Sequence, residues 1–203
     1  MEINKETRRR FNNFLIELEK EGNMNSRYFI ILFRKEILLK KSLKKKLNVQ
    51  EYNRLIKETE LTSEIIYLIE ETLLDERFSF IMGNLLNLLM CKKISISDAI
   101  VNKLCGYAFS NKMTSESIQI FCSYLGDINF EGHCDFFKKI IDMLRDKKDY
   151  MVGRISYHVA HMGCLNCYDS IKKILTSGER NGNTLYLTKE ALKILDELKN
   201  GNK

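Results

Sequence analysis

An all-α fold of stacked two-helix units, with about ten helices and no sheet, is predicted by three features of the sequence. Apolar residues recur at intervals of three and four through most of the 203 residues, which is the period of amphipathic helices. The period-two alternation of half-buried strands is missing from the sequence, and so are Gly-rich or Pro-rich turns. Two stretches of the C-terminal half resemble each other, which indicates a structural repeat.

The N-terminal part of the chain is expected to contain three helices, over residues 2–21, 26–47 and about 50–57. The first of them places Phe11, Phe14 and Leu15 on one face, and Gly22 ends it. A basic cluster occupies the last turns of the second helix: Lys40, Lys41, Lys44, Lys45 and Lys46. Because cations are favourable at the C-terminal end of a helix dipole, this cluster has a structural explanation besides a binding role.

Further helices follow in the order of the chain, each predicted from an apolar face and a polar residue at its start. Their ranges are 64–76, 77–91, 98–109, 116–125, 133–145, two short helices within 149–177, and 184–199. Helix caps are predicted at Thr62 or Ser63, at Ser97 and at Thr114 or Ser115, since their hydroxyl oxygens can accept a hydrogen bond from the first turn.

One complete helix-turn-helix unit lies within residues 149–177. Its first helix ends at Gly163, which can take the positive φ of a helix end. The same layout precedes it around Gly126, 37 positions earlier, and the sequence FKKII at residues 137–141 lines up with IKKIL at residues 171–175. This self-similarity predicts a stack of helical repeats.

A small set of residues recurs at the turns and in the second helices of these units. The set comprises Asp149, Val152, Arg154, Ala160, Gly163, Ile171, Ile174 and Leu175 in one unit, and Leu125, Gly126 and Asp127 in the unit before it. Through this shared set, residues 77–198 resemble HEAT repeats of the short bacterial type. The sequence departs from that pattern in two ways: it contains no proline, and Cys164 stands where the turn aspartate of the repeat would be. The resemblance implies a right-handed α-solenoid of HEAT-like or armadillo-type hairpins over residues 77–199. The basic helices of residues 1–76 would pack on this array, within a single domain of residues 1–203.

The composition is typical of a globular protein, with 44% hydrophobic and 30% charged residues. The strongest apolar run, residues 28–33, is far shorter than the roughly 20 residues of a membrane-spanning helix. No N-terminal signal segment is visible, so a cytoplasmic protein without a membrane partner is expected. Residues 1–57 carry 15 Lys and Arg against 7 Asp and Glu, so the net charge of +6 arises in the N-terminal quarter.

The six cysteines all lie in the repeat half, mostly among apolar residues. Without a secretion signal, buried free thiols are expected rather than disulfides. His158, His161, Cys164 and Cys167 are residue types that bind zinc, and the turn at Gly163 could bring three of them together. Steps of three residues drift around a helix by about 60° each, however, which separates His158 from Cys167. The sequence therefore predicts no metal and no other cofactor.

Motifs of catalysis are not found in the sequence, which contains no Gly-rich phosphate loop, GxSxG elbow or HExxH pair. His133 and Cys134 suggest a base and a nucleophile by composition, but neighbours along a helix point in different directions. The Cys164 and Cys167 pair lacks the βαβ context of a redox couple. A non-enzymatic function is expected.

Lysines recur at equivalent places in the predicted second helices: Lys103, Lys138, Lys139, Lys172 and Lys173. In HEAT-like proteins the second helices line the concave side, so the resemblance implies a cationic stripe along a binding surface. Such a stripe can hold phosphates or an acidic protein face. The competing interpretation is that these lysines only solvate exposed helix faces, which is common.

Three functions are compatible with these features. The first is a bacterial protein-binding module, specifically an immunity protein that neutralises a toxin domain, because stacked repeats offer long surfaces without catalytic residues. The second is nucleic-acid binding, since the chain resembles HEAT-like alkylpurine DNA glycosylases in size, helix content and basic charge, although it has no Trp. The third is a structural or self-associating helical scaffold. Oligomeric state does not follow from the sequence.

Overall fold

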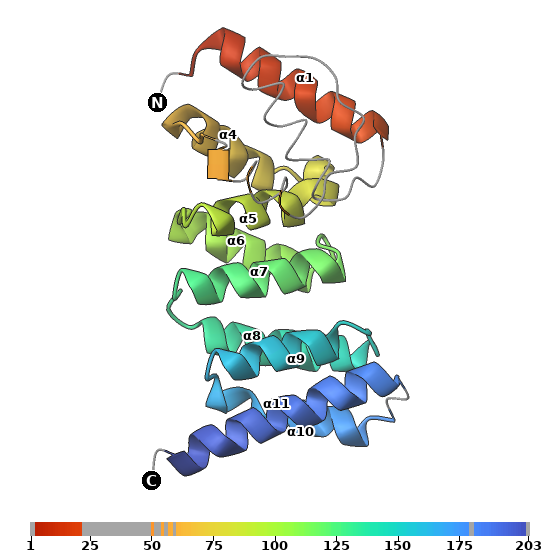
Figure 1. The fold of residues 1–203 in the computed structure, drawn as a ribbon. Helices are drawn as coiled ribbons and strands as arrows, with labels where there is room; N and C mark the ends of the chain where they lie inside the picture. The colour runs from red at the N-terminus through yellow and green to blue at the C-terminus, as the bar shows by residue number, and fades with distance from the viewer. Residues whose placement is uncertain are drawn as a thin grey trace. The chain divides into compact units, whose positions relative to one another are not determined.

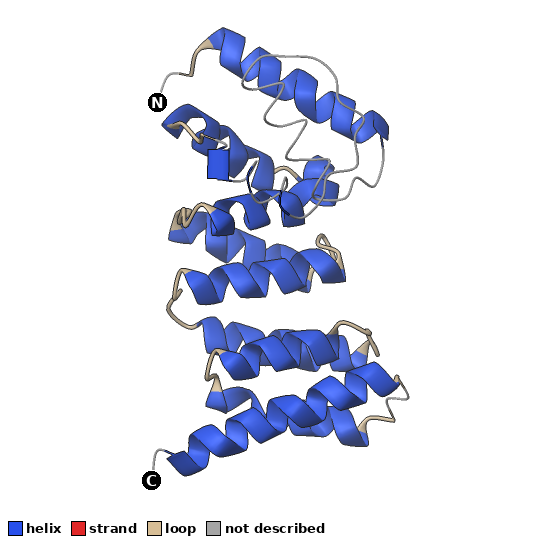
Figure 2. Ribbon diagram, in the orientation of Figure 1, coloured by secondary structure: helices blue, strands red, loops and turns tan. Residues whose placement is uncertain are grey.

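The computed structural model describes residues 3–21, 50, 54, 57–58, 60–178 and 181–201, and every regular element within them is a helix (Figure 1, Figure 2). The predicted all-α class is confirmed for this part of the chain, which contains no strand. The chain divides into two compact units, Met1–Leu104 and Cys105–Lys203. The single domain, its division near residue 77, the helix count and the solenoid arrangement stay predictions.

The first unit contains α1 (Lys5–Glu21), α4 (Ser63–Leu73), a 3-10 helix η1 (Glu76–Ile81), α5 (Met82–Cys91) and the first part of α6 (Asp98–Phe109). The predicted helix over residues 26–47 and most of the one near 50–57 lie outside the described residues. In α1, Phe11, Phe14 and Leu15 are buried as the periodicity indicates. The apolar face read from the sequence is therefore the face that packs.

One predicted helix of the first unit is split in two. The pattern predicts a single helix over residues 77–91, whereas the structure has η1 followed by α5. Asp75 caps η1, because its carboxylate accepts a hydrogen bond from the Arg77 backbone N–H at 3.1 Å and pairs with the Arg77 guanidinium at 2.6 Å. Phe78 has φ −102° and ψ 21°, outside the α-helical region, so the helical path is interrupted before Met82.

The second unit contains α7 (Ser115–Asp127), α8 (His133–Asp146), α9 (Val152–His161), η2 (Leu165–Cys167), α10 (Tyr168–Thr176) and α11 (Gly182–Gly201). These helices pack in two layers (Figure 1). In one layer α9 lies between α7 and α11, and in the other α8 lies beside α10. Successive helices therefore alternate between the layers, so residues about one hairpin apart in the sequence become neighbours.

Four successive helices end in one recurring turn. A residue in the left-handed region follows α6, α7, α8 and α9: Asn111, Asn129, Lys148 and Gly163, with φ of 60°, 50°, 54° and 75°. The backbone N–H of the next residue then donates to the carbonyl five residues earlier, as from Phe130 to Leu125 at 3.0 Å and from Asp149 to Leu144 at 2.9 Å. These Schellman-type bonds satisfy the last carbonyl groups of each helix and reverse the chain direction.

The alignment of Gly126 with Gly163 is wrong. Gly163 is the left-handed corner after α9, whereas Gly126 lies inside α7 and Asn129 is the corner of that hairpin. A side chain at Gly126 would run into Met162, so this glycine serves close packing of α7 against the end of α9. The 34-residue correspondence of residues 137–141 with 171–175 agrees with the corners, because Asn129 and Gly163 are also 34 positions apart.

The core of the second unit combines an aromatic cluster with one close helix contact. Phe136 lies at the centre of the cluster, with ring centroids 5.5 Å from Phe121 and 5.4 Å from Phe109. The close contact joins α9 and α11, where Gly153 faces the backbone of Thr184. Thr184 donates its hydroxyl to the carbonyl of Tyr150 at 3.3 Å, so this small polar residue is satisfied inside the contact.

Candidate functional site

The predicted lysines fall on two neighbouring helices and one more distant element. Lys138 and Lys139 are exposed on α8, and Lys172 and Lys173 are exposed on α10, which packs beside α8 in the same layer. Lys103 is exposed on α6 and belongs to the first unit, whereas the other four lysines belong to the second. The Lys40, Lys41, Lys44, Lys45 and Lys46 cluster lies outside the described residues.

We call the exposed side of α8 and α10 that carries these four lysines the α8–α10 face. Its charge is mixed, because Asp135 and Asp142 lie three residues before and four residues after Lys138, on the same side of α8. On α10, Asp169 stands three residues before Lys172. Lysines and aspartates therefore share this face, and the implied cationic stripe stays a prediction.

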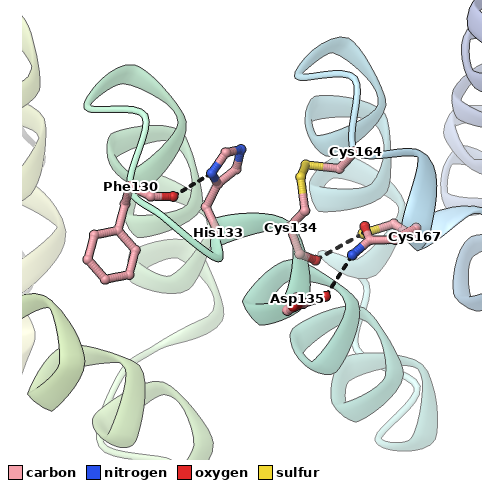
Figure 3. The surroundings of a disulfide bond; sticks show 7 residues. Phe130, His133, Cys134, Asp135, Cys164 and Cys167 are labelled. Atoms are coloured by element: carbon pink, nitrogen blue, oxygen red, sulfur yellow. Dashed lines mark hydrogen bonds between the residues drawn. A yellow bond between two sulfur atoms is a disulfide. The ribbon is translucent and has the colours of Figure 1, made fainter.

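Three polar contacts and one covalent bond join α8 to α10 and to residues 164–167, which lead into α10. Ser170 donates its hydroxyl to Asp142 at 3.1 Å, and Asn166 donates its side-chain amide to Asp135 at 2.8 Å. The Cys167 thiol donates to the backbone carbonyl of Cys134 at 3.4 Å (Figure 3). A disulfide between Cys134 and Cys164 completes the set (Figure 3). One of these contacts links α8 directly to α10, and the other three fix the start of α8 against the segment that leads into α10.

The expectation of free thiols is wrong for Cys134 and Cys164, which form that disulfide although they lie 30 positions apart. Their Cα atoms are 5.3 Å apart because the hairpin geometry places the start of α8 beside the turn after α9. The expectation holds for Cys105 and Cys167, which are free. Burial raises the pKa of Cys105 to about 11 and that of Cys167 to about 12, so both remain protonated thiols at neutral pH.

The zinc-type residues of the sequence are not brought together as one group of four. His161 stacks edge-on against Tyr157 at 4.6 Å between ring centroids, and His158 lies half-buried on α9. Instead, among the described residues, ligand atoms of His133, Cys134 and Cys164 lie within 4.8 Å of one another. Sequence spacing carries no signal for this trio, because its third member comes from the next hairpin.

Comparisons with protein-family models, with curated proteins and with solved structures found no match. Over the residues that the structure describes, no helix combines the length and apolar character needed to cross a membrane.

Lowering the pH from about 7.5 to about 5.5 should destabilise the protein through His158. Burial lowers the pKa of His158 below its ordinary value of 6.5, with His161 acting in the same direction and Asp127 in the opposite one. Its buried Nε2 atom has no hydrogen-bond partner among the described residues. His158 therefore binds a proton more readily in the unfolded chain than in the folded one. The folded state is favoured most above pH 6.5, where His158 is neutral in both states, and this stability is lost as the pH falls from 6.5 towards the lower pKa of the folded state.

The effect should be at most about 1 kcal/mol, because His158 is only half-buried and solvent screens its charge. Urea unfolding at both pH values measures it in the wild type and in His158→Gln. The wild type should lose more stability than the variant on acidification; an equal loss in both would show that other groups cause the pH dependence.

Proposed function

We propose that this protein is a non-enzymatic protein-binding module of HEAT-like hairpins, and that the α8–α10 face binds its partner. The specific form that we propose is a bacterial immunity protein that neutralises a toxin domain. The observation that carries the proposal is that four lysines are exposed on adjacent helices: Lys138 and Lys139 on α8, and Lys172 and Lys173 on α10. The hydrogen bond from Ser170 to Asp142 joins these helices, and the Cys134–Cys164 disulfide joins the start of α8 to the turn after α9. A face that is already ordered loses little conformational entropy when a partner binds.

The pattern of charge on the α8–α10 face favours a protein partner. Lysines alternate with Asp135, Asp142 and Asp169, so a matching partner must present carboxylates and cations in a particular order. Nucleic acids instead present a row of phosphates, which the three aspartates would repel. Exposed ion pairs each contribute about 0–1 kcal/mol, so the four lysines would mainly provide specificity and a faster association rate.

Nucleic-acid binding is the second candidate, and one feature of the composition favours it. Residues 22–49 contain eight Lys and Arg and one acidic residue. The net charge of this segment, 8 − 1 = +7, exceeds the net charge of +6 of the whole chain. These residues include the Lys40–Lys46 cluster and lie outside the described residues. Affinity for duplex or single-stranded nucleic acid that falls steeply with salt concentration would support this candidate over the protein-binding one.

Reversing two lysine charges should weaken partner binding about 30-fold if the α8–α10 face is the interface. The double variant Lys139→Glu and Lys173→Glu changes one exposed lysine on each helix, which places like charges opposite the acidic groups of the partner. The matched control is Lys189→Glu with Lys193→Glu, which makes the same charge change at exposed positions of α11. The control should change affinity less than about threefold.

The measurement is co-purification of the full chain with the product of a neighbouring gene, followed by titration of that product against the three proteins. Protection of cells that express the neighbouring product reports on neutralisation independently. If the wild type binds no neighbouring product and protects against none, the proposed function is wrong. If both double variants bind equally well, the function stands but the α8–α10 face is not the interface.

A further inference from the structure

A group of metal-ligand atoms lies where the start of α8 meets the turn after α9. His133 and Cys134 are the first two residues of α8, and Cys164 follows the left-handed corner at Gly163. One ligand atom from each of the three side chains lies within 4.8 Å of the other two. The structure therefore gathers one nitrogen and two sulfur donors from two separate turns, which is a donor set that zinc prefers.

The imidazole of His133 is oriented as a metal ligand would be. Its Nδ1 atom lies 2.5 Å from the carbonyl oxygen of Phe130, and since a carbonyl can only accept, Nδ1 carries the proton. The lone pair is therefore on Nε2, which lies on the side of the ring away from Phe130 (Figure 3). The ring also packs edge-on against Phe137, with centroids 5.5 Å apart. A backbone carbonyl that fixes the tautomer is the usual second partner of a zinc-binding histidine.

A tetrahedral ion fits between these donors only after the disulfide is reduced. Zinc–sulfur and zinc–nitrogen bonds of about 2.3 and 2.0 Å place neighbouring donors about 3.5–3.8 Å apart. All three donors already lie within 4.8 Å, and the two sulfur atoms, which are bonded to each other in the structure, must separate to that spacing on reduction. Cys164 is 1% exposed, while His133 and Cys134 are half-buried, so the group is sheltered on one side and open on the other. Three protein ligands leave the fourth position for water or an external ligand.

We infer that the reduced protein binds one zinc ion through Nε2 of His133 and the sulfur atoms of Cys134 and Cys164. The disulfide is the metal-free, oxidised form of the same site. A dithiol reductant supplies two electrons and two protons to the sulfur–sulfur bond and closes to its own disulfide, which leaves two protein thiols. Zinc then replaces the two thiol protons, which pass to water. This inference is independent of the proposed partner binding.

Cobalt titration of the full chain tests the site, because Co²⁺ bound to thiolates absorbs visible light whereas Zn²⁺ does not. The protein is reduced with dithiothreitol, desalted without oxygen and titrated. We expect one Co²⁺ per chain with the spectrum of a tetrahedral thiolate site, displaced by one equivalent of Zn²⁺. The oxidised protein should bind none. A reduced protein without this spectrum, or an oxidised protein that binds equally well, would overturn the inference.

Variants identify the ligands. Cys134→Ser and Cys164→Ser should each weaken Zn²⁺ binding about 100-fold, and His133→Gln about 10-fold or more. Cys91→Ser and Cys105→Ser, which remove thiols from other helices, should leave the affinity unchanged. Loss of binding in either control would show that the three-ligand set is incorrect.

Alkylation of the wild type covers the case in which a ligand variant does not fold. Bound Zn²⁺ should slow the modification of Cys134 and Cys164 by iodoacetamide at least about 10-fold, with that of Cys91 unaffected, as measured by mass spectrometry. Equal protection of Cys91 would indicate that zinc binds thiols nonspecifically, and this result would also overturn the inference.

Discussion

Replacing Tyr124 by alanine is expected to lower the free energy of unfolding by about 4 kcal/mol. Tyr124 lies on α7, is 0% exposed, and is among the largest fully buried side chains of the described residues. Truncation removes the apolar area of the ring from the core and leaves a cavity that the packed helices cannot fill completely. The second unit should then unfold at a clearly lower denaturant concentration.

The matched control for this variant is Tyr186→Ala on α11. Tyr186 is 61% exposed, so the same substitution in another helix should change stability by less than about 0.5 kcal/mol. Urea unfolding followed by far-UV circular dichroism measures both variants, with separate fits if the two units unfold in separate transitions. Similar losses in the two variants would contradict the burial of Tyr124.

Replacing Gly153 by alanine should lower the free energy of unfolding by about 3 kcal/mol. A Cβ atom at this position of α9 would lie 2.8 Å from the Cα atom and 2.9 Å from the carbonyl oxygen of Thr184 in α11. These are backbone atoms, so no side chain can rotate away and α11 itself must shift. Overpacking of this kind outweighs the gain of about 1 kcal/mol that alanine has over glycine in a helix interior.

Gly106→Ala is the control for the effect of alanine on helix propensity. Gly106 lies inside α6, and a Cβ atom there would have no neighbour within 4 Å. This substitution should therefore raise the free energy of unfolding by about 0.5–1 kcal/mol. Thermal unfolding distinguishes the two variants by the sign of the change. If Gly153→Ala also stabilises the protein, α9 and α11 do not pack as closely as the structure indicates.

Several helix boundaries could be predicted because they depend on nearby residues. Residues 98–109 were expected to form a helix, and α6 spans Asp98–Phe109. At two helix starts the sequence left two candidate caps, Thr62 or Ser63 and Thr114 or Ser115. In the structure the threonine is the cap at both, since its hydroxyl accepts a hydrogen bond from the backbone N–H three residues later. The turn after α7 was placed three residues too early, because Gly126 was given the left-handed corner that Asn129 takes. Asparagine tolerates this conformation without the signal that a glycine provides.

The candidate site was predictable in part. The four lysines of α8 and α10 were found from the repeat, and their shared face follows from the two-layer packing. The aspartates between them were visible in the sequence at helical spacing, yet only the structure shows that Asp142 accepts a hydrogen bond from Ser170 of α10 and that Asp135 accepts one from Asn166 of η2. The trio of His133, Cys134 and Cys164 was missed, because the predicted zinc set used neighbours along the chain.

Helix formation and the positions of most caps follow from hydrogen bonds and side-chain contacts that reach only four or five residues along the chain, so the order of amino acids is enough to infer them. The Cys134–Cys164 bond and the approach of Gly153 to Thr184 join residues about 30 positions apart. Such pairs depend on how whole helices pack and on the direction in which each turn sends the next helix. Only the three-dimensional structure contains that information, because many packings are compatible with the same local pattern.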